Sequence, residues 1–199
     1  MIVLLTAFEP FDDTGLNASL EGCRTFMARW GDDFDLRFLT LPVSYGADTR
    51  AVDAALSIES ADLILHTGQA AGSDSIRVEK IAVNRRYLAD HREGFSRGVS
   101  PIDAEGPESL EATLDTETAA AAIRAAGIPA RVSTDAGIYL CNHVLYRSLQ
   151  RASRSLAPVR VGFLHIPSLA EQVASPGSFH LEPEQTAAAI HAVIALQHR

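Results

Sequence analysis

Hydrophobic residues along the chain follow two spacings that alternate from one end to the other. Short runs of apolar and β-branched residues predict buried strands, whereas apolar positions three and four residues apart predict amphipathic helices. The predicted strands cover residues 2–6, 36–41, 63–66, 76–83, 130–133 and 159–167. The predicted helices cover residues 18–30, 48–58 and 116–126, a segment that starts near Cys141, and residues 183–197. Strands alternating with helices indicate βαβ units around a largely parallel sheet with helices on both faces.

Residues at the ends of the predicted elements support these boundaries. Gly31 and Gly127 follow predicted helices, Pro42 ends a strand, and Pro183 occupies the first turn of the last helix. In residues 85–111 charged residues, glycine and proline replace the apolar periodicity, and we expect a long loop over the functional site rather than a linker. At 199 residues the chain is of a length that can bury one core, so we expect one domain over residues 1–199, and no internal repeat is visible.

The composition limits the setting in which the protein works. With 47% hydrophobic residues the chain can bury a substantial core, and its net charge of −8 argues against nucleic acid or an anionic membrane as a partner. Two cysteines, Cys23 and Cys141, cannot form the disulfide framework of a small secreted fold, so we expect a cytoplasmic protein. The apolar residues 1–8 lack a basic leader and are too few to span a membrane.

Cys141 and His165 are the two candidate catalytic residues. Cys141 follows a turn that contains Gly137 and begins a helical pattern, which places its sulfur near a helix N-terminus. There the helix dipole and free backbone N–H groups favour the thiolate, so we expect the pKa to fall from about 8.5 towards roughly 3.5 to 7.5. His165 lies near the end of the predicted strand 159–167, where open α/β sheets collect catalytic groups. On local sequence alone, each residue is also compatible with a buried structural role.

Glu79, in the strand-like segment 76–83, is a candidate third member of this group. A carboxylate beside an imidazole fixes its tautomer and stabilises the imidazolium form. The alternative, an exposed strand glutamate paired with Arg77 or Lys80, stays open. Phosphate-binding Walker loops, histidine spacings typical of zinc sites and the Gly-x-Ser-x-Gly pattern are absent. We therefore predict neither a metal nor a cofactor.

Five short motifs, in order along most of the chain, resemble those of pyroglutamyl peptidase I. They are Phe8-Glu9-Pro10-Phe11, Gly68-Gln69-Ala70, Glu79-Lys80-Ile81-Ala82-Val83-Asn84, Ala136-Gly137 with Cys141-Asn142, and Phe163-Leu164-His165-Ile166-Pro167. No single motif is diagnostic, but five in register over this length form a specific signal. The resemblance implies a three-layer α/β/α sandwich with a mostly parallel, mixed sheet. It also implies a cytosolic enzyme that needs no metal and forms a homotetramer or homodimer.

The activity that the resemblance implies is the release of 5-oxoproline from the blocked amino end of a peptide. It assigns Cys141 as nucleophile, His165 as general acid/base and Glu79 as the group that orients the imidazole. It also assigns Phe8, Phe11 and Gln69 to the substrate pocket. The pyroglutamyl ring is a neutral lactam with one N–H donor and one C=O acceptor, so its pocket requires an amide-complementary group, and the amide of Gln69 meets that requirement.

Departures from the family pattern leave two alternatives open. Asp12-Asp13 replace the usual Gly-Gly, Lys80 replaces an arginine, and the segment 87–94 differs from the usual loop. A catalytically weak or silent member that binds N-terminally blocked peptides is one alternative. The other is a small-molecule enzyme of similar architecture, such as a nucleoside phosphorylase, in which residues 68–72 would hold phosphate.

Overall fold

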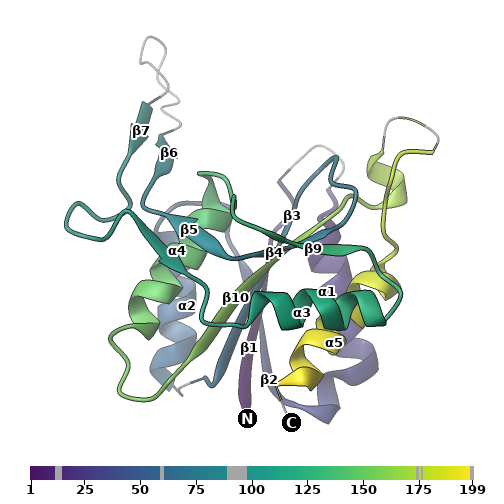
Figure 1. Cartoon of the computed structure of the whole chain (residues 1–199), viewed down its shortest axis with the longest axis horizontal. Coiled ribbons are helices and arrows are strands. Elements are labelled where there is room, and N and C mark those ends of the chain that lie inside the picture. The colour runs from purple at the N-terminus through teal and green to yellow at the C-terminus, as the bar shows by residue number, and fades with distance from the viewer. Residues whose placement is uncertain (12–14, 59–60, 89–97, 174, 176, 198–199) are drawn as a thin grey trace.

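A six-stranded sheet forms the centre of the protein (Figure 1). The computed structural model describes residues 1–11, 15–58, 61–88, 98–173, 175 and 177–197. Along the sheet the strands follow the order β2-β1-β3-β10-β4-β9. In chain order their bounds are β1 Ile2–Phe8, β2 Asp35–Leu41, β3 Leu63–Gln69, β4 Ile76–Glu79, β9 Ala130–Ser133 and β10 Arg160–Ile166.

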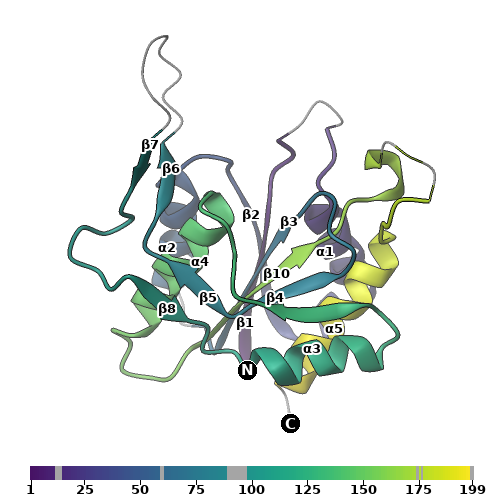
Figure 2. The ribbon, with the colours of Figure 1, turned by 45° about the horizontal axis from the view of Figure 1, so that its top comes forward.

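Strand direction brings the ends of several strands to one edge of the sheet. β1 pairs in parallel with β2 and β3, and β3 pairs in parallel with β10. β4 is antiparallel to β10 and parallel to β9, which makes the sheet mixed, as expected. The carboxyl ends of β1, β3 and β10 therefore lie side by side, and the start of β4 reaches the same edge (Figure 2).

Helices cover both faces of this sheet, which confirms the three-layer α/β/α arrangement (Figure 1). One face carries α1, α3 and α5, whose apolar residues form one core with those of the strands. The other face carries α2 and α4, which enclose a second core around Phe163 and Tyr146. The helix bounds are α1 Ala18–Trp30, α2 Ala47–Ile58, α3 Thr116–Ala125, α4 Leu140–Ala152 and α5 Pro183–Leu196, with short 3₁₀ segments at Gly31–Asp33 and Ala170–Gln172.

Two predictions about the middle of the chain are wrong. Residues 76–83 form two strands, β4 and β5 (Ile81–Val83), because the chain leaves the central sheet after Glu79 and β5 pairs with β8 (Ser109–Glu111). Residues 85–111 also contain β6 (Arg86–Leu88) and β7 (Gly98–Ser100), an antiparallel pair that projects from the body (Figure 1). Three-residue strands are too short to show a periodicity. Residues 89–97 of this segment lie outside the described part.

No helix within the described ranges is both long enough and apolar enough to cross a lipid bilayer.

Candidate active site

A cavity of about 470 Å³ opens at the carboxyl edge of the sheet. Its wall includes residues from the ends of three parallel strands and from the start of α4. All six candidate residues except Glu79 line it. The lining residues are Phe8, Phe11, Asn17, Val43, Gln69, Ala70, Arg77, Asp135, Ala136, Gly137, Tyr139, Leu140, Cys141 and His165.

Cys141 lies in the first turn of α4, as predicted. Tyr139 precedes this helix and its side chain makes no capping hydrogen bond, so the first backbone N–H groups of α4 receive no side-chain cap. The sulfur packs against Gly68 of β3, where a methyl group would lie only 2.9 Å from Sγ and 2.8 Å from Phe163 Cζ. Gly68 is the neighbour of His165 in the β3–β10 register. Glycine at position 68 therefore lets the sulfur reach the edge of the sheet beside the imidazole.

The electrostatic setting of Cys141 differs from the sequence-based expectation. Burial is the main cause that raises the pKa of its thiol to about 12, and the negative charge of Glu79 adds to this effect. The nearby Arg77 acts in the opposite direction but more weakly. The predicted lowering of the pKa by the helix N-terminus is thus wrong, because desolvation outweighs it. The sulfur needs a base to become a nucleophile.

The other cysteine, Cys23, does not line this cavity. It is fully buried in α1, and its Sγ lies 3.4 Å from Thr67 Oγ1. Burial raises the pKa of its thiol to about 12 as well. Cys141, which is partly exposed and lines the cavity, is the cysteine that a substrate can reach.

His165, which lines the cavity, forms a buried pair with Glu79, which does not. Antiparallel pairing of β10 with β4 places His165 opposite Arg77, and Glu79 lies two residues further on the same face of β4. His165 Nδ1 and Glu79 Oε1 are 2.7 Å apart, with exposed fractions of 4% and 0% for the two residues. The carboxylate accepts the hydrogen bond from Nδ1–H and leaves Nε2 for chemistry. The alternative of an exposed Glu79 is therefore wrong.

Arg77 is a cavity residue that the sequence analysis did not assign. Its Nε lies 3.3 Å from Glu79 Oε1, and its side chain is one-quarter exposed. Neither this Nε nor Glu79 Oε2 makes a hydrogen bond within the described structure, although both atoms are buried. Side chains alternate along β4, so residues 77 and 79 lie on the same face. This alternation could have indicated from the sequence that Arg77 lies beside Glu79. Arg77 supplies a permanent positive charge beside the carboxylate.

The three predicted pocket residues all line the cavity, but in different ways. Phe8 is buried at the end of β1, whereas Phe11 is 56% exposed. Gln69 Oε1 accepts hydrogen bonds from Ala18 N at 2.8 Å and from Gln172 Nε2 at 3.2 Å. The side-chain oxygen of Gln69 is therefore engaged at the start of α1, and its Nε2 group has no partner within the described structure.

Asn142, the residue after Cys141, fixes the first turn of α4. Its Oδ1 accepts from Val83 N at 2.8 Å, and its Nδ2 donates to Val83 O at 2.8 Å and to Arg85 O at 2.9 Å. The side chain is fully buried. These three bonds join α4 to β5 and the residues after it, and they hold Cys141 against the sheet.

The described residues contain no group of three or more His, Cys, Asp or Glu side chains that could hold a metal ion. The phosphate-binding alternative requires residues 68–72. The first of these, Gly68, packs against the sulfur of Cys141.

Comparison with known proteins identifies the family. The sequence profile of the pyroglutamyl peptidase family matches residues 1–198. A pyrrolidone-carboxylate peptidase of Clavibacter michiganensis is 36% identical over 96% of this chain and 90% of that protein. A pyrrolidone-carboxylate peptidase of Cupriavidus taiwanensis is 38% identical over 97% of this chain and 91% of the relative.

Solved structures agree with the sequence relatives. The pyrrolidone carboxyl peptidase of Fervidobacterium islandicum superposes with a TM-score of 0.85 at 31% identity, covering 100% of this chain and 99% of the other. Pyroglutamyl peptidase I of Bacillus amyloliquefaciens gives a TM-score of 0.83 at 27% identity, with 97% and 92% covered. The chain is therefore a cysteine peptidase and belongs to the pyroglutamyl peptidase family.

Proposed function

We propose that this protein hydrolyses the amide bond that follows an N-terminal pyroglutamyl (5-oxoprolyl) residue. Cys141 is the nucleophile, His165 the general acid/base, and Glu79 the group that orients the imidazole. The observation that carries this proposal is the placement of Cys141 and of the Glu79–His165 pair, 2.7 Å between Oε1 and Nδ1, at one cavity. The names of the relatives support the substrate class.

The reaction begins with a proton transfer, because the Cys141 thiol holds its proton at neutral pH. His165 accepts this proton as the sulfur attacks the pyroglutamyl carbonyl. The Glu79 carboxylate stabilises the imidazolium so formed. Negative charge then develops on the former carbonyl oxygen, beside the uncapped N–H groups at the start of α4. One such donor is typically worth about 10² to 10³ in rate.

The second half of the reaction reuses the same imidazole. The imidazolium gives its proton to the leaving amine as the C–N bond breaks, which leaves a thioester on Cys141 and neutral His165. His165 then takes a proton from water, the resulting hydroxide adds to the thioester, and the C–S bond breaks. The sulfur recovers its proton from the imidazolium, and free pyroglutamate leaves the cavity.

The amide side chain of Gln69 in the cavity wall supports specificity for the lactam. Because Gln69 Oε1 is engaged with Ala18 and Gln172, its Nε2 group is the part that remains to donate a hydrogen bond to the lactam carbonyl. Phe8 and Phe11 provide apolar surface for the ring, and the exposed position of Phe11 allows it to close over a bound ligand. Asp135 is the one carboxylate among the described residues that line the cavity.

The release of a fluorogenic amine from a pyroglutamyl amide tests the proposal. The pyroglutamyl amide should be cleaved, whereas matched alanyl and prolyl amides, which carry a free amine, should not. Cleavage of the prolyl amide at a comparable kcat/KM would contradict the lactam assignment. Binding of the pyroglutamyl amide without any turnover would instead support the alternative of a silent binder.

A further inference from the structure

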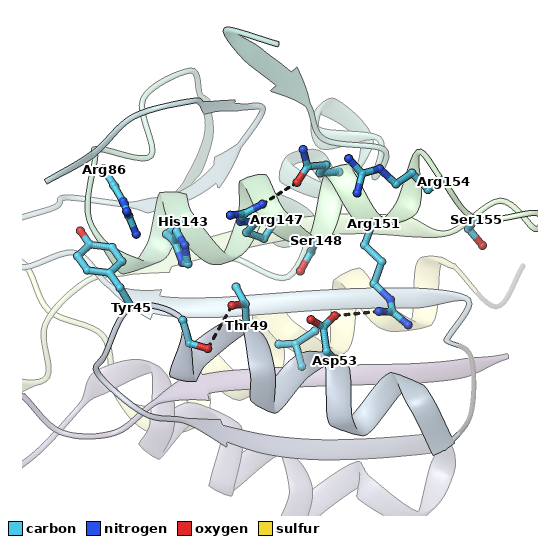
Figure 3. A pocket seen from close by; sticks show the side chains of 13 residues that line it. Tyr45, Thr49, Asp53, Arg86, His143, Arg147, Ser148, Arg151, Arg154 and Ser155 are labelled. Carbon is cyan, nitrogen blue, oxygen red and sulfur yellow. Dashed lines mark hydrogen bonds and ion pairs between the residues drawn. The ribbon is translucent and has the colours of Figure 1, made fainter. Parts of the chain in front are cut away.

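A second cavity, of about 640 Å³, lies between α2 and α4. Figure 3 shows the side chains of α4 above it and those of α2 below it. It shares no lining residue with the catalytic cavity. Its wall consists of Tyr45, Gly46, Thr49, Val52, Asp53, Arg86, His143, Arg147, Ser148, Gln150, Arg151, Arg154 and Ser155.

The wall of this cavity is positively charged, although the protein as a whole is acidic. Four arginines line it, together with a single carboxylate, Asp53, whereas the whole chain carries a net charge of −8. Asp53 forms an ion pair with Arg151, in which Asp53 Oδ1 and Arg151 Nη1 are 2.8 Å apart. Outside the cavity wall, Asp103 Oδ2 lies 3.9 Å from Arg147 Nη1 and also feels the charge of Arg154. Four guanidinium groups against these two carboxylates leave an excess of positive charge at the cavity. A bound anion would supply the missing negative charge.

Several guanidinium donors in this cavity remain unused. Arg86 donates through Nε to Ser100 Oγ at 3.1 Å, which leaves both of its terminal nitrogens without a partner in the described residues. The guanidinium of Arg154 makes no hydrogen bond there either. Arg147 is held in place by Ile102 O at 2.9 Å and Gln150 Oε1 at 3.0 Å. A fixed guanidinium with free N–H groups matches the geometry of a phosphoryl or carboxylate group.

A buried histidine adds a polar atom at one end of the cavity. His143 is only 3% exposed, and its Nδ1 lies 2.7 Å from Oδ2 of the fully buried Asp48. Its Nε2 has no partner within the described structure, and the ring lies edge-on to Tyr45 with centroids 5.2 Å apart. The Arg86 guanidinium lies 5.9 Å from the centre of the same tyrosine ring. Figure 3 shows Arg86, Tyr45 and His143 grouped together.

The helix that carries the nucleophile separates the two cavities. Cys141 and His143 are two residues apart on α4, which corresponds to a rotation of about 200° and puts their side chains on opposite faces. The Tyr45 hydroxyl donates to Ile138 O at 3.3 Å, in the segment that leads into Cys141. Tyr45 in the wall of the second cavity therefore also contacts the segment that leads into the catalytic helix.

We propose that this second cavity binds a small polyanion that carries phosphoryl groups. Arg86 and Arg154 contact the phosphoryl oxygens with their free N–H groups, Arg147 lies between them, and His143 Nε2 accepts from a ligand hydroxyl or a protonated phosphoryl oxygen. The bounded volume between two helices favours a small molecule over a nucleic acid, which requires an extended basic surface that this acidic chain lacks.

Calorimetric titration of the full chain with inorganic pyrophosphate tests this proposal. The wild-type protein should bind one pyrophosphate per chain in a saturable manner, and NaCl at the same ionic strength should not reproduce the heat. Arg86→Gln and Arg154→Gln should each weaken binding about ten- to a hundredfold, because each removes charged hydrogen bonds. Arg131→Gln, which removes the same charge from the exposed edge strand β9, is the matched control and should bind as the wild type does.

Three results would overturn the proposal. They are the absence of saturable heat with the wild-type protein, unchanged binding by both cavity variants, and an equal loss of binding in the Arg131→Gln control. Each variant should still turn over the pyroglutamyl amide, which shows that it is folded. This activity is measured independently of pyrophosphate binding. Failure of the anion site and failure of the proposed peptidase activity are thus distinguishable.

Discussion

At the scale of single residues, the proton on Cys141 decides how the site works. Cys141 is partly exposed, yet desolvation and the nearby carboxylate of Glu79 both raise the pKa of its thiol, so the helix N-terminus does not by itself generate a thiolate. In the proposed mechanism His165 therefore activates the sulfur as well as protonating the leaving group. Glu79 affects both His165 and Cys141. Its negative charge stabilises the imidazolium form of His165 and disfavours the thiolate form of Cys141.

Alkylation by iodoacetamide should reveal this dependence on His165. In the wild-type enzyme the imidazole accepts the thiol proton, so Cys141 should react at neutral pH. In His165→Ala the raised pKa of the thiol should keep it protonated, and the alkylation rate should increase only as the pH rises above about 9, towards the thiol pKa near 12. The measurement is the rate of modification of the peptide containing Cys141 against pH. Equal rates at neutral pH in both proteins would show that the thiolate forms without His165.

Gln69→Ala should lower kcat/KM for a pyroglutamyl amide by roughly ten- to a hundredfold, because the lactam carbonyl loses a donor worth about 1 to 3 kcal/mol. His165→Ala should cost far more, and Glu79→Gln an intermediate amount. Gln69 also accepts a bond from Gln172 Nε2, so Gln172→Ala is the control that removes a structural bond and keeps Nε2 of Gln69. A folded Gln69→Ala enzyme with unchanged kinetics would place the pocket elsewhere.

At the scale of elements, α4 carries residues of both cavities and depends on a few polar contacts for its position. Asn142 joins its first turn to β5, and Gly68 permits its close approach to β3. In the proposed mechanism such contacts position Cys141, and small displacements of a catalytic group are costly.

Replacement of Asn142 by Leu should destabilise the protein by about 2 to 4 kcal/mol, because the protein loses three hydrogen bonds to the backbone of Val83 and Arg85. It should also reduce kcat more strongly than KM, since α4 positions the nucleophile rather than the lactam ring. Urea unfolding and steady-state kinetics measure the two effects. A stability loss without any fall in kcat would show that Asn142 has no positioning role.

The sequence predicts most helices and strands, but not how deeply the site residues are buried or which groups they contact. The long periodic helices 18–30 and 183–197 agree with the structure to within one residue, because their patterns span several turns. The short strands after Glu79 carry too few residues for a pattern, and the resemblance supplies no information on Arg77. Whether Glu79 is buried, and how far burial raises the pKa of Cys141, depends on contacts between distant segments that periodicity does not encode.

At the scale of the whole molecule, a buried histidine links the sheet to the catalytic helix. His66 in β3 is fully buried, with Nδ1 2.7 Å from Thr6 Oγ1 and Nε2 2.9 Å from Ser148 Oγ. It thereby connects β1, β3 and α4. Burial lowers the pKa of His66 to about 3, so the folded protein holds this imidazole neutral while the unfolded chain protonates it near its ordinary value of 6.5.

Acid should therefore destabilise the protein through His66. Its contribution is fully present above pH 6.5 and is lost as the pH falls towards 3, with a slope of up to about 1.4 kcal/mol per pH unit. The unfolding free energy measured between pH 7 and pH 4 should fall less steeply for His66→Gln, whatever its stability at pH 7. Identical slopes for the two proteins would contradict a neutral, buried His66.

The most direct test of the proposed chemistry is the capture of the acyl-enzyme. The protein should be mixed with excess pyroglutamyl amide, quenched in acid within the first turnovers, digested, and analysed by mass spectrometry. We expect one pyroglutamyl group on the peptide that contains Cys141, none on the peptide that contains Cys23, and neither adduct nor turnover in Cys141→Ser. Turnover that persists in Cys141→Ser, or an adduct on Cys23, would contradict the assignment of Cys141 as the nucleophile.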